Sequence, residues 1–293
     1  MFLRKQIDRS SRSTRFFKSE RFSSVKTIVL ILISLYSVQL LAQKSGQRDW
    51  ELGVTAGVCW YNGDLNPSKL FGRDYYHETF GLSLRKNFNQ RFAFRTQLNY
   101  GTLSAADEAS TSEFQVNRNL NFSTPLYEWA NTIEFNFLPY DALLNGKRFS
   151  PYSFIGLNMF WFNPSTNVEG NIYELQPLAT EGKSYSRLSV SMPFGFGFKW
   201  AVTDRFIFNA DWGMRRTFTD YLDDTSGSYP NQSELEGLSE NLSDRSLAQS
   251  GPNGTNWGTQ RGNSQTKDWY SLVTVGLAIR IGPKKGSCKQ IGI

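Results

Sequence analysis

Few residues in this 293-residue chain have the types and spacing that catalysis requires. Its one histidine, His77, could act as a general base, but such a histidine needs a fixed serine or acid partner, and no local motif supplies one. The sequence also lacks a zinc-ligand spacing and a phosphate-binding glycine loop. We therefore interpret His77 as a rim or loop residue. We predict that the protein is not an enzyme and has no catalytic residue, metal or cofactor.

The acidic run TDYLDD is a second candidate for chemistry, because it carries Asp220, Asp223 and Asp224. Three neighbouring carboxylates could bind Ca²⁺, although their spacing differs from that of an EF-hand. The alternative is a turn in which the aspartate side chains accept backbone N–H groups. The run YNGDLNP also has the composition of a turn. We prefer the turn interpretation for both runs.

Charged residues recur on one side of eight segments in which apolar and polar residues alternate. Alternation with a period of two predicts β-strands. In the first segment, the apolar face has a tryptophan at each end, Trp50 and Trp60, and the other face is small or polar. The expected strands are Trp50–Tyr61, Thr79–Phe88, Arg91–Leu103, Leu126–Phe137, Pro151–Phe162, Arg187–Trp200, Phe206–Phe218 and Trp269–Ile281.

The connections between these strands are alternately long and short. The long ones are residues 62–78, 104–125, 163–186 and 219–268. An even number of strands of about ten residues, joined in this way, is typical of an outer-membrane β-barrel. We predict an all-β fold: an eight-stranded antiparallel transmembrane barrel, integral to the outer membrane and surrounded by its lipid, with short periplasmic turns and long extracellular loops. The alternative is a soluble up-and-down barrel of the lipocalin type, whose apolar residues would face inward.

The polar faces of a membrane barrel point inward, where buried charges must be paired. Eight strands enclose a space that side chains can just fill, so we expect a plugged polar interior with no open channel. Inward-facing Gly53 and Gly57 would leave room there for long arginines. The predicted interior charge network is Glu51, Arg85, Arg91, Arg95, Glu128, Glu134, Arg187, Lys199, Asp211, Arg215 and Arg280.

The amino-terminal region is predicted to direct export. Residues 27–41 form an apolar run that is too short for a transmembrane helix and follows a basic stretch, as in a secretory signal. We predict a signal peptide with a long basic n-region over residues 1–42, the barrel over 43–281 and a periplasmic tail over 282–293. A start at Val25 would leave an ordinary signal. Residues 1–42 carry the whole net charge of +6, so a nucleic-acid partner is not expected.

The two cysteines and the last long loop lead to two further predictions. Cys59 is expected near the outer rim and Cys288 on the periplasmic side, so we predict two free thiols rather than a disulfide. Residues 225–267 are dense in Ser, Asn and Gly, which indicates a solvated and largely disordered excursion.

Three stretches, ELGVTAGVCWYNGDLNP, LQPLATEG and RRTFTDYLDDTSGSYP, resemble the PorG-like family of outer-membrane barrels associated with type IX secretion. The resemblance extends from about Trp50 to Ile281. It implies a non-enzymatic barrel that is associated with a periplasmic ring of a lipoprotein and its partner. It also implies a structural role for Gly63, Asp64, Pro67, Arg215, Arg216, Asp220, Tyr221, Asp223 and Asp224. The last strand departs from the expected pattern, because it lacks a terminal aromatic residue and a tail follows it.

Two functions from different classes remain open. The first is a barrel that supports or anchors a type IX secretion or gliding assembly through the 138–149 turn, the 202–205 turn and residues 282–293. The second is a surface binding or adhesion barrel that acts through the 219–268 loop. A rim enzyme or a small porin is the third and least supported alternative.

Overall fold

The computed structural model describes residues 49–66, 75–144, 146–249, 251 and 254–282. By its internal contacts the chain divides into two units, Met1–Gly46 and Gln47–Ile293, and every described residue belongs to the second. The predicted signal peptide, the start at Val25, the tail beyond residue 282, Pro67 and Cys288 therefore lie outside the described residues. Within them, Cys59 is a buried free thiol.

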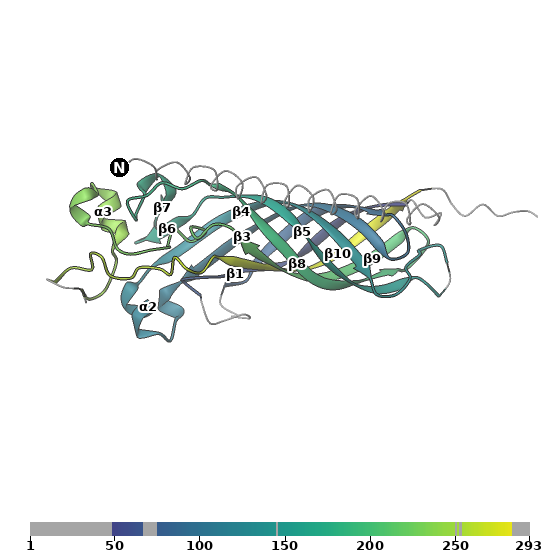
Figure 1. The fold of residues 1–293 in the computed structure, drawn as a ribbon, viewed down its shortest axis with the longest axis horizontal. Coiled ribbons are helices and arrows are strands. Elements are labelled where there is room, and N and C mark those ends of the chain that lie inside the picture. The colour runs from purple at the N-terminus through teal and green to yellow at the C-terminus, as the bar shows by residue number, and fades with distance from the viewer. Residues whose placement is uncertain (1–48, 67–74, 145, 250, 252–253, 283–293) are drawn as a thin grey trace, which may run out of the picture. The chain divides into compact units, whose positions relative to one another are not determined.

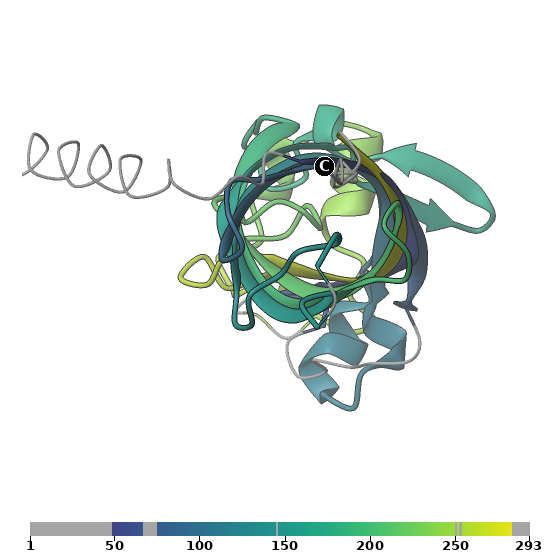
Figure 2. The ribbon, with the colours of Figure 1, turned by 90° about the vertical axis from the view of Figure 1, so that its right-hand side faces the viewer.

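Eight long strands close into an antiparallel barrel, which confirms the predicted fold class (Figures 1 and 2). Neighbours follow the order β3-β2-β1-β10-β9-β8-β5-β4, and pairing between β3 and β4 closes the ring. The barrel strands are β1 (Trp50–Asn62), β2 (His77–Asn87), β3 (Phe92–Ala106), β4 (Asn121–Asn136), β5 (Phe149–Phe162), β8 (Leu188–Ala201), β9 (Phe206–Thr217) and β10 (Trp269–Ile281).

The strands agree with the alternating segments, but β3 and β4 extend further towards the long loops than expected. Strand β4 begins at Asn121 rather than Leu126, and β3 runs to Ala106. Their ladder continues to the pair Ala106 and Asn121. Alternation in the sequence fades there because Leu103 and Ala105 are both buried, as is Ser104 between them. The extension raises one side of the barrel wall towards the long loops.

The long loops contain their own structure. Strands β6 (Ser165–Val168) and β7 (Asn171–Glu174) form a hairpin that projects from the ring in the end view (Figure 2). The other loop elements are η3 (Asp107–Ala109), α2 (Glu113–Arg118), η4 (Gln176–Leu178), η5 (Gln232–Glu234) and α3 (Leu238–Ser243). None of the helices among the described residues is both long enough and apolar enough to cross a membrane.

The prediction of a largely disordered 225–267 excursion is wrong for the part of it that the structure describes. This segment contains η5 and α3, and it buries Ser243, Asn256 and Arg261. Composition suggested disorder because the segment has few apolar residues. Its polar side chains instead find buried hydrogen-bond partners, as Arg261 does with the Ser243 carbonyl at 3.0 Å.

The outer wall of the barrel is apolar, which excludes the lipocalin alternative. Leu82, Leu157 and Leu277 are 58%, 65% and 61% exposed, whereas the residues on either side of each in its strand are small or polar and turn inward. A soluble monomer rarely exposes so large an apolar surface. Because a closed barrel also leaves no unpaired strand edge, this wall is suited to lipid. The protein is an integral outer-membrane barrel, as predicted.

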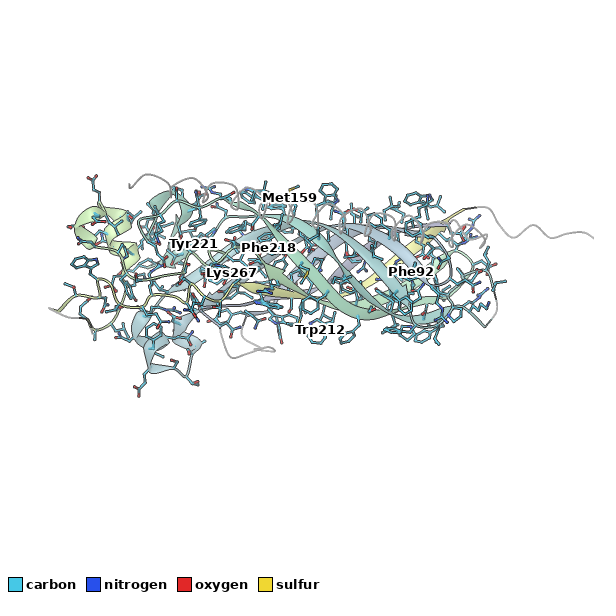
Figure 3. The ribbon with its side chains drawn as sticks, viewed as in Figure 1. Phe92, Met159, Trp212, Phe218, Tyr221 and Lys267 are labelled. Carbon is cyan, nitrogen blue, oxygen red and sulfur yellow. The ribbon has the colours of Figure 1, made fainter. Side chains whose placement is uncertain are left out.

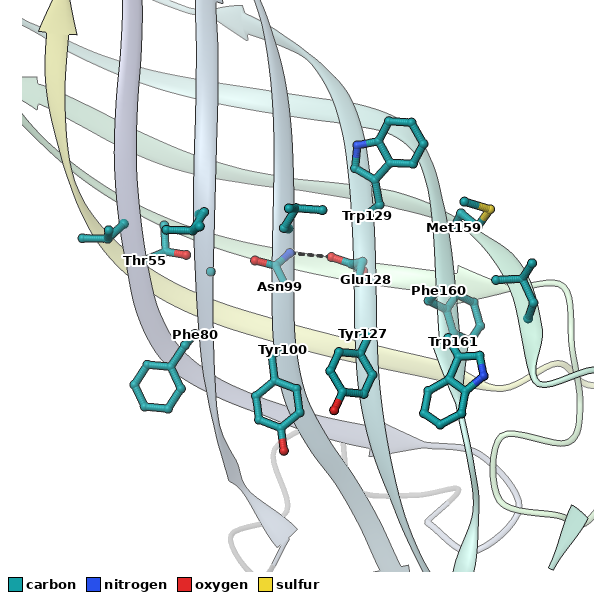
Figure 4. A pocket seen from close by; sticks show the side chains of 15 residues that line it. Thr55, Phe80, Asn99, Tyr100, Tyr127, Glu128, Trp129, Met159, Phe160 and Trp161 are labelled. Atoms are coloured by element: carbon teal, nitrogen blue, oxygen red, sulfur yellow. Dashed lines mark hydrogen bonds between the residues drawn. The ribbon is translucent and has the colours of Figure 1, made fainter.

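Aromatic rings border the apolar wall at both ends. Phe80, Tyr100, Tyr127 and Trp161 form a row on four successive strands near the long loops (Figure 4). Ring centroids in this row are 5.0 Å apart for Tyr100 and Tyr127 and 5.7 Å apart for Tyr127 and Trp161. Phenylalanines such as Phe92, which Figure 3 places near the other end, border the short-turn side. Such girdles mark the two headgroup levels of a membrane barrel.

One girdle residue differs from expectation. Trp60 lies at the loop end of β1, but it is only 3% exposed because Tyr76 packs edge-on against it with ring centroids 5.2 Å apart. Trp50, at the other end of the strand, is exposed and holds the ammonium of Lys86 over its ring at 4.2 Å.

Candidate functional site

The half of the barrel interior nearer the short periplasmic turns is organised around one carboxylate, Glu134 of β4. Three cations from three other strands converge on it. The Nε atoms of Arg85 and Arg95 lie 2.9 and 3.1 Å from its oxygens, and Lys199 Nζ lies 3.0 Å away. All four side chains are almost completely buried. Alternation places each on the inner face, and the antiparallel register brings them to one level.

Two further carboxylates complete this level. Arg85 also donates from Nη1 to Glu51 at 2.8 Å. Arg95 donates from Nη1 to Asp211 at 2.7 Å, and the Tyr152 hydroxyl donates to the same Asp211 oxygen at 2.9 Å. The arginines therefore bridge carboxylates on strands that are not neighbours in the barrel.

A second level of the interior, nearer the long loops, is organised around Glu128 of β4. Glu128 accepts hydrogen bonds from Tyr270 at 2.6 Å, Asn99 at 2.6 Å and Asn158 at 2.7 Å, and Arg215 Nε lies 3.3 Å away. The bond from Asn99 is drawn in Figure 4. Around these two levels the inner face supplies four buried cations and four buried carboxylates: Arg85, Arg95, Lys199 and Arg215, and Glu51, Glu128, Glu134 and Asp211.

Three members of the predicted interior network lie elsewhere. Arg91 is exposed at a short turn and donates to the Asn136 carbonyl at 3.2 Å. Arg187 lies at the loop end and contacts Gln176 and the exposed Glu174. Arg280 is buried, but it pairs with Asp49 at 3.0 Å at the periplasmic end. Alternation shows which face a residue occupies but not where the strand leaves the barrel, so Arg91 and Arg187 were misplaced, whereas Arg280 is on the inner face as predicted.

The periplasmic end is closed by a turn that folds inward. Tyr140 of the 138–149 turn is 1% exposed and packs in a cluster with Ala142, Ala201 and Ile207. Lys199 Nζ lies 4.9 Å from the centre of the Tyr140 ring, a cation–π contact. The turn is therefore part of the barrel plug as well as a periplasmic surface.

A second polar cluster lies at the opposite end, where the long loops meet; we call it the mouth cluster. Its members are Tyr61, Asp64, Asp107, Arg118, Glu181, Asp220, Asp223, Asp224, Arg261, Lys267 and Asp268. Figure 3 places Lys267 at this end of the barrel. At its centre, the Tyr61 hydroxyl lies 2.5 Å from Asp223 Oδ2 and 2.8 Å from Asp268 Oδ1.

Three cations pair with carboxylates of the mouth cluster. Arg118 donates to both oxygens of Asp107, at 2.7 and 2.8 Å. Arg261 donates to Glu181 at 2.9 Å and to the Asp224 carbonyl at 2.7 Å. Lys267 lies 3.8 Å from Asp220. Arg118 also donates to the Asp64 carbonyl at 2.9 Å and to the Arg261 carbonyl at 2.6 Å, so that all four long loops are joined into one folded cap over the barrel.

Burial sets the protonation of this cluster. It raises the pKa of Asp64 and of Asp224 to about 6, in the second case against the attraction of Arg261. Burial and the negative charges around them raise the pKa values of Asp223 and Asp268 well above the ordinary range. These carboxyl groups therefore hold protons more strongly than solvated aspartates do.

The sequence matches the family described as a domain of unknown function, DUF6089, over residues 26–246. The chain belongs to this family. The match covers β1 to β9 and most of the loops, so the interior network and much of the mouth cluster lie within the DUF6089 domain. No curated protein matches the chain.

Several solved outer-membrane proteins are similar to this DUF6089 protein at low identity. The attachment invasion locus protein Ail of Yersinia pestis, solved with the heparin analogue sucrose octasulfate, is 11% identical with a TM-score of 0.40, and the match covers 80% of this chain and 99% of Ail. OprG of Pseudomonas aeruginosa is 9% identical with a TM-score of 0.39, and the match covers 82% of this chain and 98% of OprG. Neisserial surface protein A is 10% identical with a TM-score of 0.38, and the match covers 78% of this chain and 96% of that protein. Likeness at this level carries no functional argument.

The two sequence runs of the DUF6089 protein that suggested a structural motif do meet in the mouth cluster. Tyr61 leads the YNGD run and contacts Asp223 of the TDYLDD run, and Asp64 accepts from the Asn263 amide at 2.7 Å. Gly63 packs so closely that an added Cβ would lie 2.0 Å from the Tyr61 hydroxyl. Tyr221 stacks on Tyr185 with ring centroids 4.6 Å apart.

The remaining motif residues of the DUF6089 protein have other surroundings. Arg215 belongs to the interior network, whereas Arg216 faces outward with its guanidinium 6.0 Å from the centre of the Trp269 ring. Side-chain alternation in β9 separates these two neighbours onto opposite faces of the wall.

The structure gives no support to the candidate cation site at Asp220, Asp223 and Asp224. These side chains turn to different partners, respectively Ser226 at 2.6 Å, Tyr61, and Tyr185 at 2.6 Å. Across the described part of the chain, no group of three or more His, Cys, Asp or Glu side chains is arranged to hold a metal ion. Asp223 Oδ1 accepts the Thr225 amide, which is the turn chemistry that the sequence favoured.

His77 has a partner that sequence reasoning missed. Its Nε2 lies 2.5 Å from Ser104 Oγ, across the ladder between β2 and β3. Within the described residues no carboxylate is hydrogen-bonded to His77, so this contact lacks the acid that would orient a catalytic base. The 27-residue separation explains why no local motif revealed the serine.

Proposed function

We propose that this protein is a non-enzymatic scaffold of the outer membrane that supports or anchors a type IX secretion or gliding assembly. The observation that carries the proposal is the filled interior, in which four buried cations face four buried carboxylates. Such a barrel acts through its surfaces rather than through a lumen. The resemblance of three sequence stretches to PorG-like barrels supports the choice of assembly.

The periplasmic surface supplies the proposed contact. Phe137, Leu138 and Val202 expose about half of their side-chain surface beside the short turns. Arg148 and Asp204 form an ion pair that joins the 138–149 and 202–205 turns. An apolar patch ringed by polar residues is the usual anatomy of a protein-binding surface. Its proposed partners are a periplasmic ring lipoprotein and the protein that binds it, with residues 282–293 as a further contact.

An affinity pull-down from gently solubilised outer membrane tests this function. Leu138→Asp combined with Val202→Asp should remove co-purified periplasmic lipoproteins and reduce secretion, while the barrel still inserts. Leu247→Asp is the matched control, because Leu247 is 69% exposed on the extracellular cap. The proposal would be contradicted if the wild-type barrel captures no partner and if secretion is unchanged after deletion of its gene.

The folded cap favours one second candidate, a surface binding barrel. Loops 62–66, 110–118 and 260–269 enclose a polar groove of about 550 Å³, lined by residues including Asp64, Phe114, Gln115 and Lys267. A cap held by buried ion pairs offers a fixed surface, as binding requires. Phe114→Ala should abolish surface binding or adhesion and leave secretion unchanged. Leu138→Asp combined with Val202→Asp should instead reduce secretion and leave surface binding unchanged.

A further inference from the structure

Two buried carboxyl groups in the mouth cluster share one phenol. Tyr61, Asp223 and Asp268 are at most 2% exposed, and the Tyr61 hydroxyl is within hydrogen-bonding distance of both acids. A phenol carries one hydrogen and can donate to only one of them. The other carboxyl oxygen faces the Tyr61 oxygen at 2.8 Å or less, and two acceptors at that distance require a proton between them.

The outer oxygens of the two acids are already occupied. Asp268 Oδ2 accepts the Leu222 amide at 2.9 Å, and Asp223 Oδ1 accepts the Thr225 amide at 3.0 Å. These bonds fix both carboxyl groups with their remaining oxygens directed at Tyr61. The arrangement therefore depends on what lies between those oxygens and the phenol.

The surrounding charges do not neutralise the pair. From the segment after β1 it faces Asp64, and from its own long loop it faces Asp220. Arg118 of α2 interacts electrostatically with Asp223, but its guanidinium is engaged by Asp107. Arg261 and Lys267 pair with Glu181, Asp224 and Asp220. In the mouth cluster seven carboxyl groups thus face three paired cations, and Arg245 near Asp107 does not remove the excess.

We propose that Asp223 and Asp268 share one proton through Tyr61, and that this proton latches the mouth cluster closed. The shared proton ties the end of β1 to the 219–226 segment and to the residue that precedes β10. Its loss leaves two buried carboxylates facing one phenol, and their repulsion separates these segments. The latch is a pH-sensitive device that acts on the extracellular cap and is independent of the partner on the periplasmic side.

The test follows amide hydrogen exchange of the full-length barrel in lipid vesicles, from about pH 6 to about pH 9, corrected for the intrinsic pH dependence of exchange. The Leu222 and Thr225 amides report the latch directly. In the wild type, above the range in which Asp64 and Asp224 titrate, their exchange should rise by about tenfold per pH unit, the slope for one released proton. Amides of β3 and β4 should stay protected and show that the barrel remains folded.

Asparagine variants sharpen the test. In Asp268→Asn or Asp223→Asn, the amide oxygen keeps the backbone bond and the NH₂ group replaces the shared proton by donating to Tyr61. Each single variant should stay closed at high pH, with exchange at least tenfold slower than in the wild type. The double variant leaves the Tyr61 hydrogen without a carboxylate acceptor. Its Leu222 and Thr225 amides should therefore exchange faster than those of the single variants at every pH.

Three results would overturn the latch. One is a wild-type exchange rate that is flat with pH after correction, which decides the matter even if the variants do not fold. Another is a double variant as protected as the single ones. The third is opening by a chelator at constant pH, because a bound cation would then hold the two acids.

Discussion

The barrel buries charge in two regions and neutralises it in two ways. In the interior, four cations from the strands face four carboxylates, and each acid has at least one cation or several hydrogen bonds directed at it. In the mouth cluster the carboxyl groups outnumber the cations, and Tyr61 bridges two of them. The interior is held by ion pairs, whereas we propose that a proton holds the mouth.

The difference follows from what positions each region. Interior side chains stand on a closed ladder of strands, so a cation on one strand meets an acid on another at a fixed height. The mouth is built from loops whose contacts join residues up to 207 positions apart. A shared proton can join two acids without a long cationic side chain between them. This suits crowded loop segments, such as Gly63 beside Tyr61. The interior should therefore resist pH changes that open the mouth.

The largest expected effect comes from removing the centre of the interior network. Glu134→Gln leaves Arg85, Arg95 and Lys199 without their shared carboxylate, and an unpaired buried charge of this kind costs about 3–5 kcal/mol. Urea titration in lipid vesicles, read by heat-modifiable gel mobility, should show the loss. Glu174→Gln is the control, because its pair with Arg187 is exposed. Equal stability of the two variants would show that the interior charges are not coupled.

A smaller effect is expected when the mouth is overpacked. In Gly63→Ala the new methyl group would lie 2.0 Å from the Tyr61 hydroxyl and 2.3 Å from Asp268 Oδ1, so the latch must separate. Overpacking typically costs about 1–3 kcal/mol, here confined to the cap. Exchange of the 219–226 amides should rise while barrel unfolding stays unchanged. Gly227→Ala, whose Cβ would meet nothing closer than 3.6 Å, should match the wild type.

The pH dependence should separate the regions without any mutation. Asp64 and Asp224 have folded-state pKa values raised from 3.8 to about 6, so the stability they give the cap is complete below about pH 4 and is lost as pH rises through about 6. Asp223 and Asp268 extend this loss to higher pH. Cap exchange should therefore increase with pH. A cap that becomes more stable between about pH 5 and about pH 8 would contradict this sign.

The smallest effect is expected at an exposed ion pair. Asp204→Asn removes the partner of Arg148 between the two periplasmic turns, where both side chains are partly solvated. Such pairs contribute between about 0 and 1 kcal/mol, so barrel stability should hardly change. A loss similar to that of Glu134→Gln would show that burial does not distinguish the ion pairs of this barrel.

Sequence patterns predicted the barrel wall far better than the cap. Alternation located all eight barrel strands and the inward side of Glu134 and Arg95, because the period of two is a property of the strand itself. It misplaced Arg91 and Arg187, since nothing local marks the point where a strand leaves the wall. The YNGD and TDYLDD runs were recognised as turns, but their meeting at Tyr61 depends on the closed ring.

Other residues of the mouth carried no sequence signal. Arg118 and Arg261 lie in loops of ordinary polar composition, and Asp268 is a single polar residue before a strand. Their roles arise from contacts between separate loops, such as Arg261 with Glu181, 80 residues apart. Polar composition indicated disorder over 225–267 because it reports apolar content and not the hydrogen-bond partners that the other loops provide.

The most direct test of the shared proton is the infrared spectrum of the folded barrel in lipid at about pH 8, where carboxyl groups with a pKa of about 6 are ionised. A shared proton predicts a C=O stretching band of a protonated carboxylic acid, shifted in D₂O and absent from both Asp223→Asn and Asp268→Asn. Glu181→Gln should retain the band. A wild-type spectrum without such a band, or a band that persists in both asparagine variants, would contradict the shared proton.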